Sequence, residues 1–297
     1  MICFQAGRQP GGNHCFLLDR AQGKKIIMTE GEKAYCSRFK GTLIRDNTLV
    51  PADQILIRET PLEIFVNGIS IVRTQCLARN VAQMVAGFAF CEGFLEKPSD
   101  LKKMKVDPDS GRADLEIDLP PEKLEYFAGH ERMAAGGGRT ALLGWTGTVS
   151  RPFARVSSGL TVDAAELLRI GNDFNNVEGL YRDSRFVHSA ALADSGKMIA
   201  HFEDVGRHNA LDKAIGYAFL NALDFDRLML LCSGRLSMEM VTRAACLGVP
   251  VYVSPATASL NAVRFAESID MTLCGRVKPD SAYIYSAPWR VITGDEK

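Results

Sequence analysis

The sequence predicts an α/β protein whose C-terminal half forms a layered sheet, preceded by a smaller α+β region. In the C-terminal half, short apolar runs alternate with segments of helical periodicity, which is the rhythm of β-α-β units. The earlier region combines a hairpin signature with one amphipathic segment. The chain has 297 residues, 46% hydrophobic and 24% charged, so composition and length suit a globular protein with two cores.

Three segments are predicted along the chain. Residues 1–50 are rich in Gly, Lys and Arg with weak periodicity, which indicates a lead segment with one or two peripheral strands. Residues 51–150 form a small α+β domain that ends in a glycine-rich loop at 132–148. That loop could approach an anion closely, but its local sequence favours an interdomain linker. Residues 151–297 form the α/β domain.

The α+β domain is expected to contain a hairpin, a helix and a further strand. Residues 62–66 and 69–73 flank Asn67-Gly68, a two-residue turn whose positive φ angles match the twist of paired strands. Apolar residues at helical spacing predict a helix over residues 78–92 that ends at a glycine. Alternating charged and apolar residues predict a half-exposed strand over residues 114–119.

The α/β domain starts with a helix that Thr161 caps and that runs to about residue 175. A hairpin around the turn Asp194-Ser195-Gly196 follows, and then a helix with Asn209 as its N-cap. The remaining chain alternates buried-type strands with helices. The hairpin strands are 186–193 and 198–202, the later strands 228–232, 251–253 and 271–274, and the later helices 237–247 and 259–268.

Polar residues follow these strands where a ligand is expected. In open α/β sheets, ligands lie beyond the carboxyl ends of the strands, where helix N-termini offer unpaired N–H groups. An arginine fork suits phosphate because it donates two parallel hydrogen bonds. Repetition of hydroxyls and cations on one edge therefore predicts a phosphate or nucleotide site. The groups are Ser233-Gly234-Arg235, Ser254–Ser259, and Arg276 with Lys278.

The loop Glu203–His208 concentrates charge beside apolar sequence. Arg207 and Lys213 could pair with Glu203, Asp204 or Asp212 as a structural ion network. Alternatively, the acids could orient Arg207 and His208, or contact the donor groups of a purine or pterin ring. Both interpretations stay open. His188 alone is more typical of a core histidine than of a ligand. The paired-cysteine zinc pattern P-C-x-x-C does not occur, so no directly bound metal is predicted.

Charge and cysteine usage limit the classes of function. Thirty-five basic and 35 acidic residues cancel, so we expect no attraction to nucleic acid or to a membrane surface. No apolar run reaches the roughly 18 residues of a membrane span, and the opening residues lack a secretory core. Eight irregularly spaced cysteines favour free thiols in a reducing compartment. A cytoplasmic protein is expected.

The run EDVGRHNALDK at residues 203–213, with the SGR and SPAT segments, resembles the signature of the FdhD family of formate dehydrogenase accessory proteins. The resemblance covers roughly residues 55–290. It implies a three-layer cytidine-deaminase-like C-terminal domain and a homodimer. It also implies that sulfur passes as a persulfide from a cysteine desulfurase to the molybdenum cofactor, a bis(molybdopterin guanine dinucleotide), before that cofactor enters formate dehydrogenase.

The family's dinucleotide-binding segment falls in register on residues 276–281, where Lys278 and Pro279 match it outright. Residues of the charged loop and of the predicted sheet edge complete the candidate cofactor-binding set. The full set is His188, Asp204, Arg207, His208, Ser233, Arg235, Ser254, Arg276, Val277, Lys278, Pro279, Asp280 and Ser281.

The family's reactive cysteine is not where the resemblance places it. That position is Ala135, the second family cysteine falls on Gly138, and neither residue can hold sulfur. A persulfide carrier needs an exposed thiolate with a depressed pKa. Cys232 and Cys274 end predicted strands beside the site and are the fallback carriers, although a core role is more typical of such cysteines.

Three explanations for the missing thiol stay open. Another cysteine took over, the protein binds the cofactor without moving sulfur, or the native residue was altered. Two main hypotheses follow, an FdhD-type sulfur carrier and a non-catalytic cofactor-binding chaperone. Hydrolysis of the nucleotide deaminase type would need bound zinc.

Overall fold

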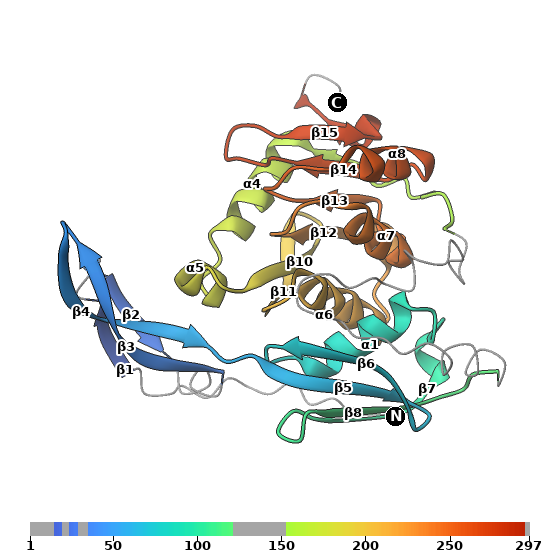
Figure 1. Ribbon diagram of the computed structural model, residues 1–297. Coiled ribbons are helices and arrows are strands. Elements are labelled where there is room, and N and C mark those ends of the chain that lie inside the picture. Colours follow the sequence, from blue (N-terminus) through green and yellow to red (C-terminus); the bar gives the residue numbers. More distant parts are fainter. Residues whose placement is uncertain (1–14, 20–23, 29–34, 121–152, 295–297) are drawn as a thin grey trace. The chain divides into compact units, whose positions relative to one another are not determined.

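The structure, a computed structural model, describes residues 15–19, 24–28, 35–120 and 153–294 (Figure 1). The chain divides into two compact units between Arg58 and Glu59. The expected boundary at residue 51 instead falls inside strand β4 (Thr48–Ile57), and the one near residue 150 lies outside the described residues. The second unit contains the four-stranded and the six-stranded sheet, and residues of both share one hydrophobic core.

The described part of the first unit is two antiparallel hairpins, where the sequence predicted one or two peripheral strands. The turn Asp46-Asn47 has φ angles of 47° and 59°, the conformation of a two-residue hairpin turn. Apolar and polar residues are mixed on both faces of the second hairpin, so the alternation that reveals a strand is missing. The strands are β1 (Cys15–Asp19), β2 (Lys24–Met28), β3 (Cys36–Arg45) and β4.

The second unit begins with a four-stranded sheet in the order β6-β5-β8-β7. The predicted hairpin is confirmed, and its turn residues Asn67 and Gly68 have φ angles of 48° and 84°. The predicted helix and strand are present, whereas β7 was not predicted. The elements are β5 (Thr60–Val66), β6 (Ile69–Cys76), helix α1 (Val81–Cys91), β7 (Leu101–Asp107) and β8 (Arg112–Ile117).

A six-stranded sheet in the order β11-β10-β12-β13-β14-β15 forms the rest of the second unit. Strands β12, β13 and β14 are parallel, and β10 and β15 are antiparallel to their neighbours. The predicted strands are confirmed, and β15 is an additional edge strand. They are β10 (His188–Asp194), β11 (Lys197–Asp204), β12 (Met229–Cys232), β13 (Val251–Val253), β14 (Thr272–Gly275) and β15 (Tyr283–Ser286).

Helices cover both faces of this sheet, as expected for a layered α/β domain (Figure 1). One face packs against α6 (Arg207–Leu220), α7 (Met238–Leu247) and α8 (Leu260–Ser268), and the other against α4 (Ala164–Asn175). The shorter elements are β9 (Val162–Asp163), α5 (Leu180–Ser184), β16 (Val291–Ile292) and the 3₁₀ turns η2 (Pro98–Asp100), η3 (Phe225–Arg227) and η4 (Pro288–Arg290).

Two predicted helix caps are wrong. The cap of α4 is Asp163, not Thr161, because the Asp163 carboxylate accepts a hydrogen bond from the Ala165 N–H at 2.9 Å. Helix α6 begins at Arg207 after Gly206, so Asn209 lies inside the helix rather than at its N-cap. The Asn209 amide instead donates to the Gln75 carbonyl at 2.8 Å and to Asp204 at 2.9 Å, contacts that local sequence does not reveal.

Helices α1 and α6 cross at two glycines. A Cβ at Gly87 would lie 1.9 Å from the carbonyl oxygen of Asp212, and a Cβ at Gly216 would lie 1.9 Å from that of Gln83. No side chain fits at such separations, so glycine is required at both positions. The crossing packs α1 directly against the middle and the C-terminal part of α6.

A buried ion triad joins the same helices to α7. Both terminal nitrogens of Arg243 are used, one bonding Asp212 at 2.8 Å and the other Glu92 at 2.5 Å. The side chains of all three residues are at most 2% exposed. Burial lowers the pKa of the Arg243 guanidinium, but the two carboxylates raise it by more, so the arginine stays charged. The triad fixes α1, α6 and α7 to one another.

Within the described ranges, no helix combines the length and the apolar character that a membrane crossing requires.

Candidate functional site: the carboxyl edge of the six-stranded sheet

The loops that the sequence predicted to share an edge do so. Strands β12, β13 and β14 are parallel, and β11 runs in the same direction because both β11 and β12 are antiparallel to β10. The loops that follow these four strands therefore meet at one edge of the sheet, which we call the carboxyl edge. Helices α6, α7 and α8 begin there, so their N-termini point positive dipole ends toward the same region.

Backbone hydrogen bonds join these loops to each other. The Leu236 N–H donates to the Thr257 carbonyl at 3.0 Å, and the Ser259 N–H donates back to Leu236 at 3.1 Å. The Arg276 N–H donates to the Ala256 carbonyl at 2.8 Å. The three loops after β12, β13 and β14 thus form one connected surface.

Ser254 belongs to this framework and is not available to a ligand. Its side chain is fully buried, its hydroxyl donates to the Gly234 carbonyl at 2.8 Å, and the same oxygen accepts from the Ala256 N–H at 3.0 Å. The sequence placed Ser254 among the binding residues because a hydroxyl follows a strand end. In the structure this hydroxyl connects two loops instead.

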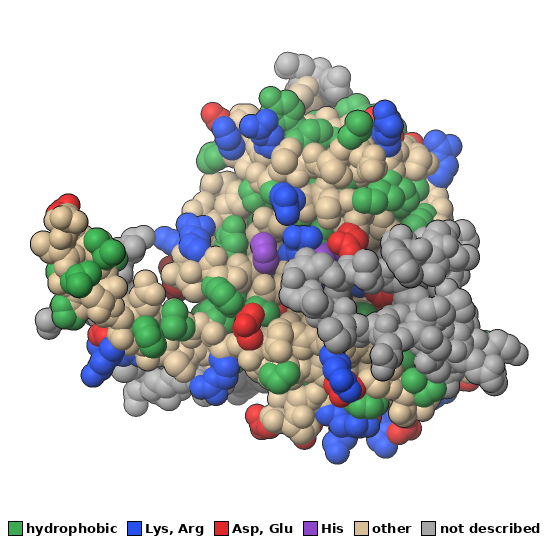
Figure 2. All heavy atoms as spheres, viewed as in Figure 1, with side chains coloured by type: hydrophobic (Ala, Val, Ile, Leu, Met, Phe, Trp, Pro, Cys, Tyr) green, Lys and Arg blue, Asp and Glu red, His purple; other side chains and the backbone are tan. Residues whose placement is uncertain are grey.

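Three cations remain on the surface of the carboxyl edge. Arg235, Arg276 and Lys278 are exposed, and in the described part of the chain none of them forms an ion pair with a carboxylate. Figure 2 shows Lys, Arg and His side chains together near the centre of the viewed face. Exposed, unpaired cations beside three helix N-termini are suited to an anionic ligand.

Arg207 and His188 lie at the inner side of this edge. The Arg207 Nε is buried and finds no hydrogen-bond partner in the described residues, while its aliphatic part packs on Gly234. His188 Nδ1 lies 3.3 Å from the Ser233 hydroxyl, which itself accepts from the Ser189 N–H at 2.9 Å. Burial, and then the charges of Arg207 and His208, lower the pKa of His188. A neutral histidine and an unsatisfied arginine donor suit a phosphate oxygen.

His208 connects two of the helix starts. Its Nε2 lies 3.1 Å from the Glu239 carboxylate, which belongs to the first turn of α7. The imidazole is buried, and burial is the main reason that the pKa of His208 is lowered, although Glu239 opposes the shift. His208 therefore positions the N-termini of α6 and α7 and is not exposed to a ligand.

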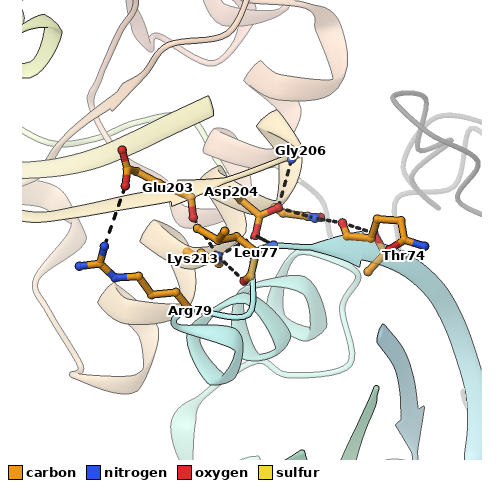
Figure 3. A network of polar contacts seen from close by, with 9 residues as sticks. Thr74, Leu77, Arg79, Glu203, Asp204, Gly206 and Lys213 are labelled. Carbon is orange, nitrogen blue, oxygen red and sulfur yellow. Dashed lines mark hydrogen bonds and ion pairs between the residues drawn. The ribbon is translucent and has the colours of Figure 1, made fainter. Parts of the chain in front are cut away.

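The acids of the charged loop form the structural ion network (Figure 3). Asp204 is fully buried, pairs with the Lys213 ammonium at 2.6 Å and accepts from the backbone N–H groups of Leu77 and Gly206, each at 3.1 Å. Glu203 accepts from the Tyr181 N–H at 2.7 Å and lies 3.9 Å from Arg79. The predicted ion network is therefore observed for Lys213 but not for Arg207, which forms no ion pair with a carboxylate among the described residues. Asp204 is not a ligand contact.

The segment at residues 276–281 divides between core and surface. Val277 is buried and packs on α4, where a Cβ at Gly171 would lie 2.6 Å from its Cγ1, so it does not face a ligand. Pro279, Asp280 and Ser281 are exposed in a turn that is closed by the Lys278 N–H, which donates to the Ser281 carbonyl at 2.8 Å. This turn holds Lys278 at the surface.

Neither fallback thiol is accessible. Cys232 is buried and its sulfur accepts a hydrogen bond from the Tyr252 hydroxyl at 2.9 Å, while burial raises its pKa. Burial raises the pKa of Cys274 to about 12. All six cysteines in the part of the chain whose side chains are described are buried, and Ala135 and Gly138 lie outside that part. Buried, protonated thiols are poor nucleophiles.

Sequence reasoning missed two tyrosines at this edge. Tyr283 and Tyr285 lie on β15, directly after the segment 276–281, and Tyr283 pairs with Gly275 at the carboxyl end of β14. The pattern Tyr-Ile-Tyr, with aromatic residues two apart, was the available signal for a strand with both rings on one face.

The sequence model of the FdhD/NarQ family matches residues 57–292, close to the range of the resemblance. The chain belongs to the FdhD/NarQ family. A protein named sulfur carrier protein FdhD from Bacillus subtilis is 28% identical over 239 residues, which cover 80% of this chain and 90% of the relative. The FdhD of Wolinella succinogenes, with the same protein name, is 28% identical over 247 residues, which cover 82% and 84% of the two chains.

The fold is shared with a solved structure. The crystal structure of a protein assigned as a formate dehydrogenase accessory protein, from Desulfotalea psychrophila, superposes with a TM-score of 0.71 at 23% identity. The superposition covers 87% of this FdhD/NarQ chain and all of that one. Within the described residues, no group of His, Cys, Asp and Glu side chains is arranged to hold a metal ion.

Proposed function

We propose that this FdhD/NarQ protein is a formate dehydrogenase accessory protein that binds the molybdenum cofactor, as a bis(molybdopterin guanine dinucleotide), at the carboxyl edge. One observation carries the proposal. The exposed cations Arg235, Arg276 and Lys278, the unsatisfied Nε of Arg207 and three helix N-termini lie on the same edge of one sheet. A dinucleotide brings phosphates, and this set of donors suits phosphate oxygens.

The probe for this site is GDP, which carries the guanine and two phosphates of the proposed ligand. We expect Arg207→Ala, Arg235→Ala and Lys278→Ala each to weaken GDP binding by about ten- to a hundredfold, because a hydrogen bond to a charged group contributes about 1.5–3 kcal/mol. Titration calorimetry at fixed ionic strength measures the three dissociation constants. Raising the salt concentration should weaken the wild-type complex as well.

Lys197→Ala is the matched control, since Lys197 is exposed at the first residue of β11, on the opposite edge of the same sheet. Its GDP affinity should equal that of the wild type. Unchanged affinity in both Arg235→Ala and Lys278→Ala would show that the carboxyl edge is not the site.

Sulfur transfer is the second candidate function, and the names of the curated relatives favour it. In this version the protein accepts sulfur as a persulfide from a cysteine desulfurase and passes it to the cofactor before delivery to formate dehydrogenase. The buried state of Cys232 and Cys274 argues against both as carriers, because the thiolate is the attacking species. A carrier would have to be another thiol of the chain.

Sulfur loading tests this function directly. After incubation with a cysteine desulfurase and cysteine, peptide mass mapping should show no added sulfur on Cys232 or Cys274. An added sulfur on another cysteine would establish the carrier function. With no adduct on any of the eight cysteines, only the cofactor-binding chaperone would remain. A stable adduct on Cys232 or Cys274 would contradict the role that we assign to their burial.

The wider setting is part of the same proposal. We place the protein in the cytoplasm as a homodimer that contacts the cysteine desulfurase and formate dehydrogenase, following the family resemblance. We also propose that the six-stranded domain follows the three-layer cytidine deaminase arrangement. The mixed sheet with helices on both faces supports that assignment.

A further inference from the structure

Two stacked tyrosines stand beside the cations of the carboxyl edge. The ring centroids of Tyr283 and Tyr285 are 6.1 Å apart and their planes differ by 13°. Tyr283 is 59% exposed, although a large aromatic side chain normally gains from burial. Its partner across the sheet is Gly275, the last residue of β14, so the exposed ring lies at the carboxyl edge and not elsewhere along the strand.

The inner ring of the pair is held in place from two sides. The Tyr285 hydroxyl lies 3.4 Å from the Thr257 hydroxyl in the loop that precedes α8. A Cβ at Gly275 would lie 2.6 Å from Cε2 of Tyr285, so this ring rests directly on the backbone of β14. The absence of a side chain at Gly275 therefore allows Tyr285 to support Tyr283 from a fixed position.

A cation completes the arrangement. The guanidinium carbon of Arg276 lies 5.4 Å from the ring centroid of Tyr283, within the range of a cation–π contact. Arg276 has a φ of 53°, a left-handed conformation that is uncommon for a residue with a side chain, and its N–H is fixed by the Ala256 carbonyl. The backbone thus holds the arginine at the end of β14, next to the two rings.

We propose that Tyr283, supported by Tyr285 and Arg276, is a stacking platform for a planar fused heteroaromatic ring of the ligand. Aromatic and guanidinium planes stack on nucleic acid bases, and arginine can bind a phosphate from the same position. The ring would be guanine or pterin, both of which the proposed dinucleotide contains. This inference rests on the proposed function and adds the residue that recognises the ring rather than the phosphates.

The experiment compares three probes, GDP, inorganic pyrophosphate and neopterin, on the full-length protein by titration calorimetry. Tyr283→Ala should weaken the binding of GDP or of neopterin, whichever ring stacks on Tyr283, about tenfold, because stacking of one base contributes about 1–3 kcal/mol. Pyrophosphate binding should be unchanged. Tyr283→Phe keeps an aromatic ring and should bind the same probe as tightly as the wild type does. This variant separates stacking from any role of the hydroxyl.

Trp289→Ala is the matched control. Trp289 is 61% exposed and has Arg290 at 5.8 Å from its ring, but it follows the opposite end of β15. Its removal should change none of the three affinities. A thermal melt of each variant shows whether the fold is intact, and Tyr283→Ala should melt as the wild type because the side chain is exposed.

Each outcome decides the proposal. Weaker binding of GDP alone identifies the ring as guanine, and weaker binding of neopterin alone identifies it as pterin. If Tyr283→Ala binds both as the wild type does while Lys278→Ala loses GDP, the platform is wrong and the proposed function stands. If the wild-type protein binds none of the three probes, both are wrong.

Discussion

Replacement of Arg243 by methionine is expected to lower the free energy of unfolding by about 3–5 kcal/mol, because it leaves two buried carboxylates without their shared cation. Asp212 and Glu92 bond Arg243 at 2.8 Å and 2.5 Å, and the guanidinium is fully buried. Methionine keeps the length of the side chain and removes the charge. Urea unfolding followed by circular dichroism at pH 7 measures the change.

Arg264→Met is the control for the loss of an arginine as such. Arg264 is exposed on the neighbouring helix α8, and surface substitutions usually change stability by less than about 0.5 kcal/mol. A double variant with Glu92→Gln should recover part of the loss, since one of the two carboxylates that lost the Arg243 cation is then neutral. If Arg243→Met unfolds at the urea concentration of the wild type, the triad does not hold the three helices together.

Substitution of Gly87 by alanine should destabilise the protein by about 3 kcal/mol or more, at the upper end of overpacked sites. The new Cβ would lie 1.9 Å from the Asp212 carbonyl oxygen, a backbone atom that moves only if the whole of α6 moves. Alanine gains about 1 kcal/mol of helix propensity over glycine, which does not offset the clash. Differential scanning calorimetry should show a lower melting temperature.

Gly171→Ala provides the comparison within a helix. Its Cβ would meet only side-chain atoms of Val277, the closest being Cγ1 at 2.6 Å, and a side-chain methyl can rotate or shift. The same gain in propensity applies, so we expect a much smaller loss of stability than for Gly87→Ala. Equal melting temperatures for the two variants would mean that the close helix crossing does not limit stability.

Local patterns predicted most of the second unit. The Asn67-Gly68 hairpin and the alternation of strands and helices after β11 depend on turn residues and periodicity, which neighbouring residues determine. The cap predicted for α6 failed because a distant segment binds the Asn209 amide. Asn209 is a good capping residue by type, but its amide bonds Gln75, which is 134 positions away. Nothing near Asn209 in the sequence indicates that contact.

Local sequence predicted the candidate site only in part. Strand order placed the loops on one edge, and the cations Arg235, Arg276 and Lys278 remain exposed there. The sequence could not separate these side chains from Asp204 and Ser254, whose polar atoms are buried and satisfied by partners from other segments. Whether a polar residue at a strand end meets a ligand or the protein depends on tertiary contacts, not on residue type.

The hydrogen bonds that Ser254 makes to the adjoining loop have a consequence for the thermodynamics of recognition. Loops whose backbone is already fixed before a ligand binds lose little conformational entropy on binding. More of the interaction energy then contributes to affinity. Preorganisation of this kind also means that a ligand can dissociate without unfolding of the loops, which suits the proposed delivery of a cofactor to an enzyme.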